Sequence, residues 1–308
     1  MITIYKGTES GLETIAQPAS GCWIKVVDPS PEEVAQLAET LNIPQDFVTY
    51  PLDMDERART EKENGATLIV LRVPHFQGEA SDVPYVTVPL GIVVTGSFVA
   101  TVSKVETSVV QALNQARELS TSKRNRFILR VLRITANRYL HDLRKIDSIV
   151  EVLEDRLQHS QRNRELLELL KYQKSLVYFT TALKSDELIL RHLHKSLLFQ
   201  QHAEDLDLLE DVLTEVQQAI EMTNISSNIL SQMMDAFASI ISNNLNAVMK
   251  FLASVTIILS LPTMIASFFG MNVRLPLGQL SWAFPLILVF AVMVCASVAV
   301  LFWRKDWL

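Results

Sequence analysis

Two apolar runs near the C-terminus limit what this chain can fold into more than any other feature. Phe251–Phe269 is 19 residues long and Trp282–Trp303 is 22, and neither contains a charged residue. At the helical rise of about 1.5 Å per residue, either run can cross a hydrocarbon layer of about 30 Å. A buried hairpin in a soluble protein is the alternative, but tryptophans bracket the second run as in an aromatic belt. The sequence therefore predicts a membrane hairpin.

Charge separates an acidic body from this tail. The whole chain has a formal net charge of −6. Residues 246–308 contain four basic residues and one acidic residue, a balance of +3, which leaves −9 on residues 1–245. The chain has only two cysteines, Cys22 and Cys295, which offer neither a disulfide framework nor the spacing of a metal site. An acidic body of this kind also shows no basic patch for nucleic acid.

Basic residues flank the hairpin on its outer sides. Lys250 precedes the first run, while Arg304 and Lys305 follow the second. By the positive-inside rule these flanks lie in the cytoplasm, and Arg274 is the only charge in the loop between the runs. The N-terminus has neither the basic nor the apolar region of a signal peptide. We therefore expect a multi-pass protein of the plasma (inner) membrane with both termini in the cytoplasm.

The first hundred residues mix strand and helix signals. Ser30 and Glu33 form a capping box with Pro31 at the first helical position, and a second short helix is expected from Pro44. Four stretches rich in β-branched residues predict strands, at 22–27, 66–73, 85–95 and 97–103. The predicted fold class is an α/β domain whose sheet comes early in the chain, with helices after it.

A tract without glycine or proline follows, from Ser97 to Leu261. Its apolar period is helical, with breaks near 120–122, 159–160 and 200–202. The last helix, from about Ala203, has no stop signal before the first apolar run, so we expect one continuous helix of roughly 90 Å. The predicted division is a body at 1–200, a stalk helix at 201–249, transmembrane helices at 250–270 and 282–303, a loop at 271–281 and a basic tail at 304–308.

The first apolar run carries a polar seam at helical spacing. Its members are Asn246, Met249, Ala253, Thr256, Ser260, Thr263, Ser267 and Gly270. Beyond Met249 every member is small or hydroxylated, whereas we assign Leu252, Ile257, Ile258, Leu261, Ile265 and Phe268 to the opposite face. The seam has two interpretations: close helix packing through small residues, or the lining of a narrow pore around a symmetry axis. The amide of Asn246 at the membrane edge slightly favours the pore.

The end of this run carries a family resemblance. Gly-Met-Asn at Gly270–Asn272, within "NAVMKFLASVTIILSLPTMIASFFGMN", resembles the exit of the first transmembrane helix in the CorA magnesium transporter family. The C-terminal "FWRKDWL" resembles the basic terminus of that family. The segment "LDMDERARTEKENGATLIVLRV" is similar to its acidic helix-to-strand segment.

The resemblance implies a funnel-shaped homopentamer in a lipid bilayer. The stalk helix would continue into a pore-lining first span, and the second span would form an outer ring. Pore-facing positions would be Asn246, Met249, Leu252, Thr256, Ser260, Thr263 and Gly270, with Ser267 added by the seam. Met249 and Leu252 would form a hydrophobic gate that closes by dewetting. The implied function is a channel-like transporter of divalent cations, above all Mg²⁺ uptake, with no organic substrate.

The chemistry of the filter at Gly270, Met271 and Asn272 follows from the ion. Magnesium gives up its octahedral waters reluctantly, so a ring of Asn272 carbonyls, with those of Gly270, suits a hydrated ion. Carboxylates would bind it too tightly for conduction. A glycine at the helix exit permits a left-handed conformation and a close backbone approach. Arg274 departs from the acidic loop common in the family, which widens the prediction to other divalent cations.

Regulation is expected in the body. The resemblance implies that Mg²⁺ bound between neighbouring bodies keeps the pore closed. Asp211 matches the acidic residue on the stalk, and its partner from the neighbour would be Asp53 or Asp55, with Asp53 preferred. Five bodies of charge −9 would repel one another, and a divalent ion would relieve that repulsion.

Other functions remain open. A zinc, cobalt or nickel transporter of the same fold, coupled to protons, is one alternative; His192, His194 and His202 form the only histidine cluster near the stalk, and helix-surface histidines are the commoner explanation. A membrane-anchored sensor or scaffold is a second, although an anchor has no need of a hydroxyl stripe. We find no catalytic Ser/His/Asp group and no phosphate loop, so an enzyme is not expected.

Overall fold

The computed structural model describes residues 1–8, 11–116, 119–160, 163–196, 199, 203–271 and 282–307. The chain divides into two compact units, Met1–Met234 and Asp235–Leu308. The first unit contains a sheet with helices on both faces, and the second contains the apolar helices.

Seven strands form one mixed sheet in the order β2-β1-β3-β7-β6-β5-β4. Among these strands β3 and β7 run parallel and the other neighbours pair antiparallel. The bounds are β1 Ile2–Thr8, β2 Gly11–Ile15, β3 Cys22–Val27, β4 Arg59–Glu63, β5 Ala66–Phe76, β6 Tyr85–Val94 and β7 Phe98–Ser103. The four predicted strands are confirmed as β3, β5, β6 and β7, whereas β1, β2 and β4 were not predicted; β1 begins with a short strand-like run, Ile2–Tyr5, and β2 and β4 have little apolar signal.

The three missed strands lie toward the two edges of the sheet. β4 has the sequence "RTEKE", and β2 at the other edge has no fully buried residue. Charged, exposed edge strands are common because they discourage pairing with other chains, and the same polarity hides them from pattern reading. The expected acidic helix before β5 is wrong: Asp53–Asp55 form a turn, and the chain then enters β4.

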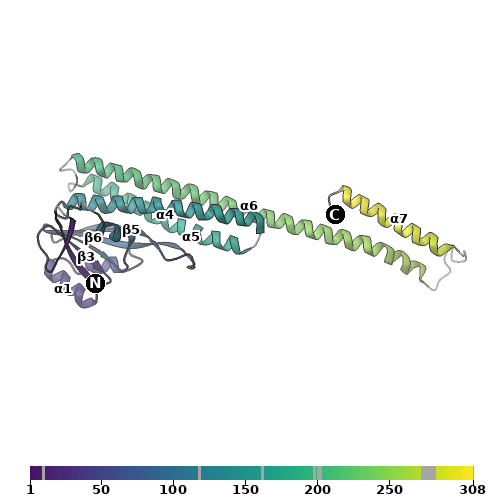
Figure 1. Cartoon of the computed structure of the whole chain (residues 1–308), viewed down its shortest axis with the longest axis horizontal. Helices are drawn as coiled ribbons and strands as arrows, with labels where there is room; N and C mark the ends of the chain where they lie inside the picture. The colour runs from purple at the N-terminus through teal and green to yellow at the C-terminus, as the bar shows by residue number, and fades with distance from the viewer. Residues whose placement is uncertain are drawn as a thin grey trace. The chain divides into compact units, whose positions relative to one another are not determined.

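Short helices cover one face of the sheet. α1 (Pro31–Leu41) begins with the predicted capping box, and α2 (Asp46–Thr49) and a 3₁₀ turn (Tyr50–Leu52) follow it. Their apolar residues pack against alternate residues of the central strands in a core cluster that includes Ile24, Val26, Val34, Leu37, Phe47, Leu68 and Val70. Figure 1 shows α1 on one side of the sheet and the long helices on the other.

The opposite face packs against α4 (Arg124–Ser160) and α5 (Asn163–Lys195). Trp23 alternates with the α1-facing residues of β3, so its ring reaches this side. Its centroid lies 5.5 Å from that of Phe127, and its Nε1 donates to Thr101 Oγ1 at 2.9 Å. Deeper in the layer, Tyr139 and Phe179 meet edge to face at 5.0 Å. A small helix, α3 (Ser108–Asn114), joins β7 to this layer.

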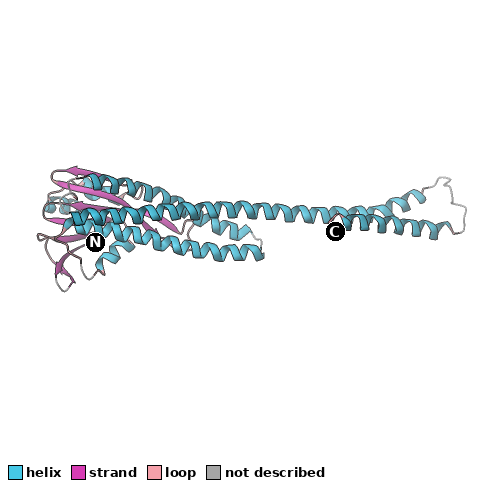
Figure 2. Cartoon of the chain, turned by 90° about the horizontal axis from the view of Figure 1, so that it is seen from above, coloured by secondary structure: helices cyan, strands magenta, loops and turns pink. Residues whose placement is uncertain are grey.

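The last helix of the layer is α6, Ala203–Phe269, which runs unbroken from the first unit into the second. This confirms the predicted continuous helix. Beside α4 it runs in the same direction, since Arg133 pairs with Glu215 at 3.5 Å and Ser226 donates to Asp147 at 2.7 Å (Figure 2). Residues 203–234 belong to the first unit and bury apolar side chains within it, including Leu209, Val216 and Ala219.

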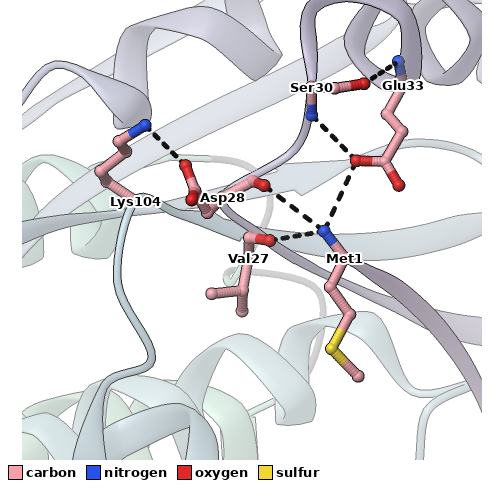
Figure 3. A network of polar contacts seen from close by, with 6 residues as sticks. All are labelled: Met1, Val27, Asp28, Ser30, Glu33 and Lys104. Atoms are coloured by element: carbon pink, nitrogen blue, oxygen red, sulfur yellow. Dashed lines mark hydrogen bonds and ion pairs between the residues drawn. The ribbon is translucent and has the colours of Figure 1, made fainter.

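The N-terminus is bound into the same unit. The amino group of Met1 donates to the Val27 carbonyl at 2.7 Å and lies 3.5 Å from Glu33 Oε2, which also accepts from the Ser30 amide (Figure 3). Asp28 pairs with Lys104 beside it. These contacts hold the start of β1, the end of β3 and the start of α1 together.

Candidate functional site

The second unit contains two helices long and apolar enough to cross a membrane: the C-terminal part of α6, and α7 (Ala283–Arg304). Only 6% of the most apolar window of each is buried. A core hairpin of a soluble protein would be mostly buried, so this exposure argues against that alternative. Trp282 and Trp303 at the two ends of α7 are both exposed.

One face of α6 packs against α7. Ser254 is 0% exposed, and half-buried positions continue the same face at Ile258, Leu261 and Ile265. Pro262 lies inside α6 and has no N–H to donate to the carbonyl of Ile258. Cys295 of α7 donates its thiol to that carbonyl at 3.6 Å. The two helices are therefore joined at the point where the proline interrupts the hydrogen bonding of α6.

The seam lies on the other side of α6. All eight of its residues, from Asn246 to Gly270, are exposed in the single chain. At about 100° per residue, Thr256, Ser260, Thr263 and Ser267 point roughly 150° away from the Ser254 face. Leu252 is also exposed and precedes Thr256 by four residues, so it lies with the seam. Its assignment to the opposite face was wrong, because helical spacing separates it from Ile258 and Leu261.

Three of the seam hydroxyls already use their protons within the helix. Thr256 donates to the Leu252 carbonyl at 2.8 Å, Ser260 to Ile257 at 2.9 Å and Thr263 to Leu259 at 3.1 Å. A hydroxyl that has donated its proton still has lone pairs to offer. The seam therefore presents acceptors, the polarity that suits the water shell of a cation.

The helix ends at the predicted place but in a different way. Gly270 donates its amide to the Ala266 carbonyl at 2.9 Å, and Met271 donates to Phe268 at 3.4 Å. Gly270 does not have a positive φ, so the expected left-handed exit is wrong. Glycine suits this position for a steric reason instead: a Cβ here would lie 3.3 Å from the Ala266 carbonyl oxygen. Asn272 and Arg274, the other predicted residues of the pore mouth, lie outside the described residues.

The predicted gate and the basic flank are also exposed. Met249 and Leu252, about one and two turns inside Asn246, are 57% and 58% exposed in the single chain. Lys250 lies between them on the surface, and Arg304 and Lys305 close α7. Beyond them the ring of Trp307 turns back to stack on Phe302 at 5.4 Å.

The predicted regulatory acids lie in two separate places within the chain. Asp53 accepts from the Asp55 amide at 3.0 Å in the turn before β4, and Asp55 lines a cavity of about 660 Å³. Asp211 lies on α6 and lines a different cavity, of about 310 Å³. Within the described ranges, no group of three or more His, Cys, Asp or Glu side chains is placed to hold a metal ion. His194 contacts Glu210 at 3.1 Å, and His202 lies outside those ranges.

Sequence reasoning missed an arginine that holds the acidic turn. Arg72 of β5 donates from Nη1 to the carbonyls of Met54 and Glu56 at 2.7 and 2.9 Å, and from Nε to Thr87 Oγ1 at 3.3 Å. The turn that carries Asp53 and Asp55 is thus attached to β5, the strand next to the edge strand β4. A charged residue at a central position of an otherwise apolar strand was the signal for this role.

The backbone of Arg72 is anchored from the other side. β4 pairs with β5 only as far as Val70, and Arg72 lies opposite Pro89, which has no N–H. The backbone groups of Arg72 therefore pair with helix side chains: its N–H donates to Asp186 Oδ1 at 3.0 Å, and its carbonyl accepts from the Tyr139 hydroxyl at 2.8 Å. Burial raises the pKa of the Asp186 carboxyl well above its usual range, an effect that the Arg72 amide and guanidinium only partly oppose.

Comparison with known proteins identifies similar chains. The family model described as CorA-like Mg²⁺ transporter protein matches residues 18–305. The cobalt/magnesium transport protein CorA of Methanocaldococcus jannaschii is 26% identical over 296 residues, which cover 93% of this chain and 91% of that protein.

Solved structures show the same fold. The complete structure of the CorA magnesium transporter from M. jannaschii matches with a TM-score of 0.88 at 24% identity and covers 100% of this chain and 99% of its own. The cytoplasmic domain of ZntB from Vibrio parahaemolyticus matches with a TM-score of 0.61 at 12% identity, over 78% of this chain and 98% of that domain. At these identities the likeness supports the fold alone.

Proposed function

The chain belongs to the family of CorA-like Mg²⁺ transporter proteins, and from this premise we propose that it conducts divalent cations, Mg²⁺ above all, through a pore formed by five copies of α6. The observation that carries the proposal is the exposed seam. α7 covers the Ser254 face of α6, and the acceptor-rich seam on the other side is left for neighbouring copies.

The seam suits a hydrated cation. Mg²⁺ keeps its waters where it can, and those waters need acceptors for their protons. Thr256, Ser260 and Thr263 supply hydroxyl oxygens whose protons are already used.

The two ends of the path have different tasks. At the inner end, rings of Met249 and Leu252 form a gate that stops ions by excluding water. At the outer end, Gly270, Met271 and Asn272 form the filter, and five copies of Arg274 surround its entrance. The path lies in the plasma membrane with the body and both termini in the cytoplasm, consistent with Lys250, Arg304 and Lys305 on one side. In the pentamer the stalk at 201–249 joins the body at 1–200 to the transmembrane helices at 250–270 and 282–303.

Bound Mg²⁺ closes the pore. Asp211 of one copy and Asp53 of the next share the ion, with Asp55 as the other candidate. The separation of these acids within the single chain is what a site between copies requires. The Arg72 bonds to Met54 and Glu56 support the proposal because they give the Asp53 turn a defined position.

A flux assay tests the transported ion. Purified protein in liposomes is compared for Mg²⁺, Zn²⁺, Co²⁺ and Ni²⁺ under one driving force, with and without a proton gradient. We expect Mg²⁺ flux that needs no proton gradient. Zinc flux driven by protons with magnesium inert would overturn the choice of ion.

A matched pair of cysteine substitutions tests the pore. Ser267 lies on the seam, and Ala266 beside it points about 100° away around the helix; both are small and exposed. In a Cys295→Ala background, a charged methanethiosulfonate reagent should block Mg²⁺ flux through Ser267→Cys and leave Ala266→Cys conducting. Equal block of the two variants, or no block of Ser267→Cys, would contradict a pore along the seam.

The zinc alternative is not favoured. The relative with 26% identity is a cobalt/magnesium transport protein, whereas the likeness to the ZntB cytoplasmic domain, at 12% identity, concerns the fold alone. None of the relatives and structures described above favours the scaffold alternative.

A further inference from the structure

α4 and the residue just before it carry a row of cations that the acidic composition of the body hides. Lys123, Arg126, Arg130 and Arg133 follow one another at spacings of three, four and three residues, and all are exposed. Side chains at these spacings are neighbours on a helix surface, so like charges repel. The first turn of α4, at Arg124, adds the positive end of the helix dipole. This row is therefore a concentrated positive surface in a body of charge −9.

Acidic residues of α6 neutralise only part of the row. Arg126 pairs with Glu204 and with Asp205, and Arg133 pairs with Glu215. Lys123 and Arg130 form no ion pair with any residue in the part of the chain that the structure describes. Two cations thus remain available, and Arg130 lies between Arg126 and Arg133.

All four cations line a single cavity of about 310 Å³ between α4 and α6. Among the described residues of its lining Asp211 is the one acid, and apolar side chains such as Leu119 and Val212 complete the lining. A second cavity, of about 900 Å³, is also lined by Lys123 and Arg126, adds Lys62 and Arg124, and contains the two acids that pair with Arg126, Glu204 and Asp205. Lys123 and Arg126 line both cavities, so the positive surface continues from the first cavity into the second.

We propose that the cavity between α4 and α6 binds an oligophosphate anion. Planar guanidinium groups donate to phosphate oxygens in pairs, and phosphates in series can contact cations that lie in series along a helix. The anion can come free or as its magnesium complex. These two sources place Asp211 in opposite roles: its carboxylate repels a free anion, whereas it can coordinate the metal of the complex.

Calorimetric titration of the full-length protein with inorganic tripolyphosphate tests the site. Arg130→Gln should weaken binding by roughly tenfold, the loss expected for one charge-assisted hydrogen-bonding group. Arg144→Gln is the matched control: it removes the same charge from an exposed position of α4 outside the cavity. Added salt should weaken wild-type binding. No binding to the wild type, or equal weakening by the two variants, would overturn the proposal.

Asp211→Asn identifies the source. If the free anion is the ligand, this variant binds tripolyphosphate more tightly and added Mg²⁺ does not help. If the magnesium complex is the ligand, Mg²⁺ strengthens binding to the wild type, and Asp211→Asn removes that gain. If Asp211→Asn binds tripolyphosphate as the wild type does, both with and without Mg²⁺, the anion does not bind in this cavity. The assay measures binding alone, so its failure leaves the transport proposal untouched.

Discussion

Asp186→Asn should change how the stability of the body depends on pH. Asp186 is only 4% exposed, its Oδ1 accepts from the Arg72 amide, and its buried Oδ2 has no hydrogen-bond partner among the described residues. Burial raises the pKa of this carboxyl, so the folded protein holds a proton at a pH where the unfolded chain, with a pKa of about 3.9, has lost it. Stability therefore falls as the pH rises from about 4 toward the folded pKa, by up to about 1.4 kcal/mol per pH unit.

The asparagine variant keeps the Oδ1 acceptor but loses the titrating proton. Its amide N–H₂ takes the place of Oδ2 and has no acceptor nearby, which costs about 1–3 kcal/mol. We therefore expect Asp186→Asn to be less stable than the wild type at pH 5. The difference should shrink, and then reverse, as the pH rises toward 8, because only the wild type must then take up a proton on folding or bury a charge.

Urea unfolding of the full chain between pH 5 and 8 measures this difference. Trp23 is fully buried and is the only tryptophan of the first unit, so its fluorescence reports on the sheet. Glu187→Gln is the control, since Gln217 and Arg191 lower the pKa of that neighbouring carboxyl. The stability that the Glu187 carboxylate contributes is lost only below this pH range. The slope of the unfolding free energy against pH, between pH 5 and 8, should therefore be the same for Glu187→Gln and the wild type. Parallel curves for Asp186→Asn and the wild type would refute the reasoning.

Three other substitutions have defined outcomes. Asp211→Lys should hold the channel in one gating state at every Mg²⁺ concentration, measured as liposome flux; closure on Mg²⁺ like the wild type would show that the site between bodies is misplaced. Arg274→Glu reverses five charges at the pore mouth, so Mg²⁺ capture should rise several-fold at low salt and the gain should fade at high salt; a salt-independent effect would contradict electrostatic capture. Cys295→Val removes the thiol that bonds the Ile258 carbonyl, for a loss of about 1 kcal/mol that should lower the melting temperature of the detergent-solubilised protein; an unchanged melting temperature would show that this contact does not join α6 to α7.

The tail was the part of the chain most open to sequence reasoning. Two charge-free runs, the tryptophans at the ends of the second and the seam spacing depend on local composition and helical period alone. The seam is predicted as one face of a helix because 3.6 residues per turn holds in any environment. Leu252 was placed wrongly because it was grouped with the other large apolar residues, although it precedes Thr256 by four residues and so shares the seam's side of the helix.

In the body, the sequence predicted an element only where the composition of the segment itself is typical of that kind of element. β3, β5, β6 and β7 were found because buried central strands are rich in β-branched residues. β4 was missed because its five residues, "RTEKE", are paired by β5 rather than by their own propensity. The row of cations on α4 was also hidden, because its members are interspersed with buried apolar residues and average out against the acids of α6.

What this sequence determines by itself is therefore local: the apolar lengths, the helical seam, the continuous helix into the first span and the Gly-Met-Asn resemblance. The tertiary structure alone decided that Arg72 holds the acidic turn, that Asp186 takes the place of an absent strand partner, and that α7 covers the Ser254 face of α6. Each of these pairs residues from separate elements of the chain. Such contacts arise from packing, to which no local pattern of residues corresponds.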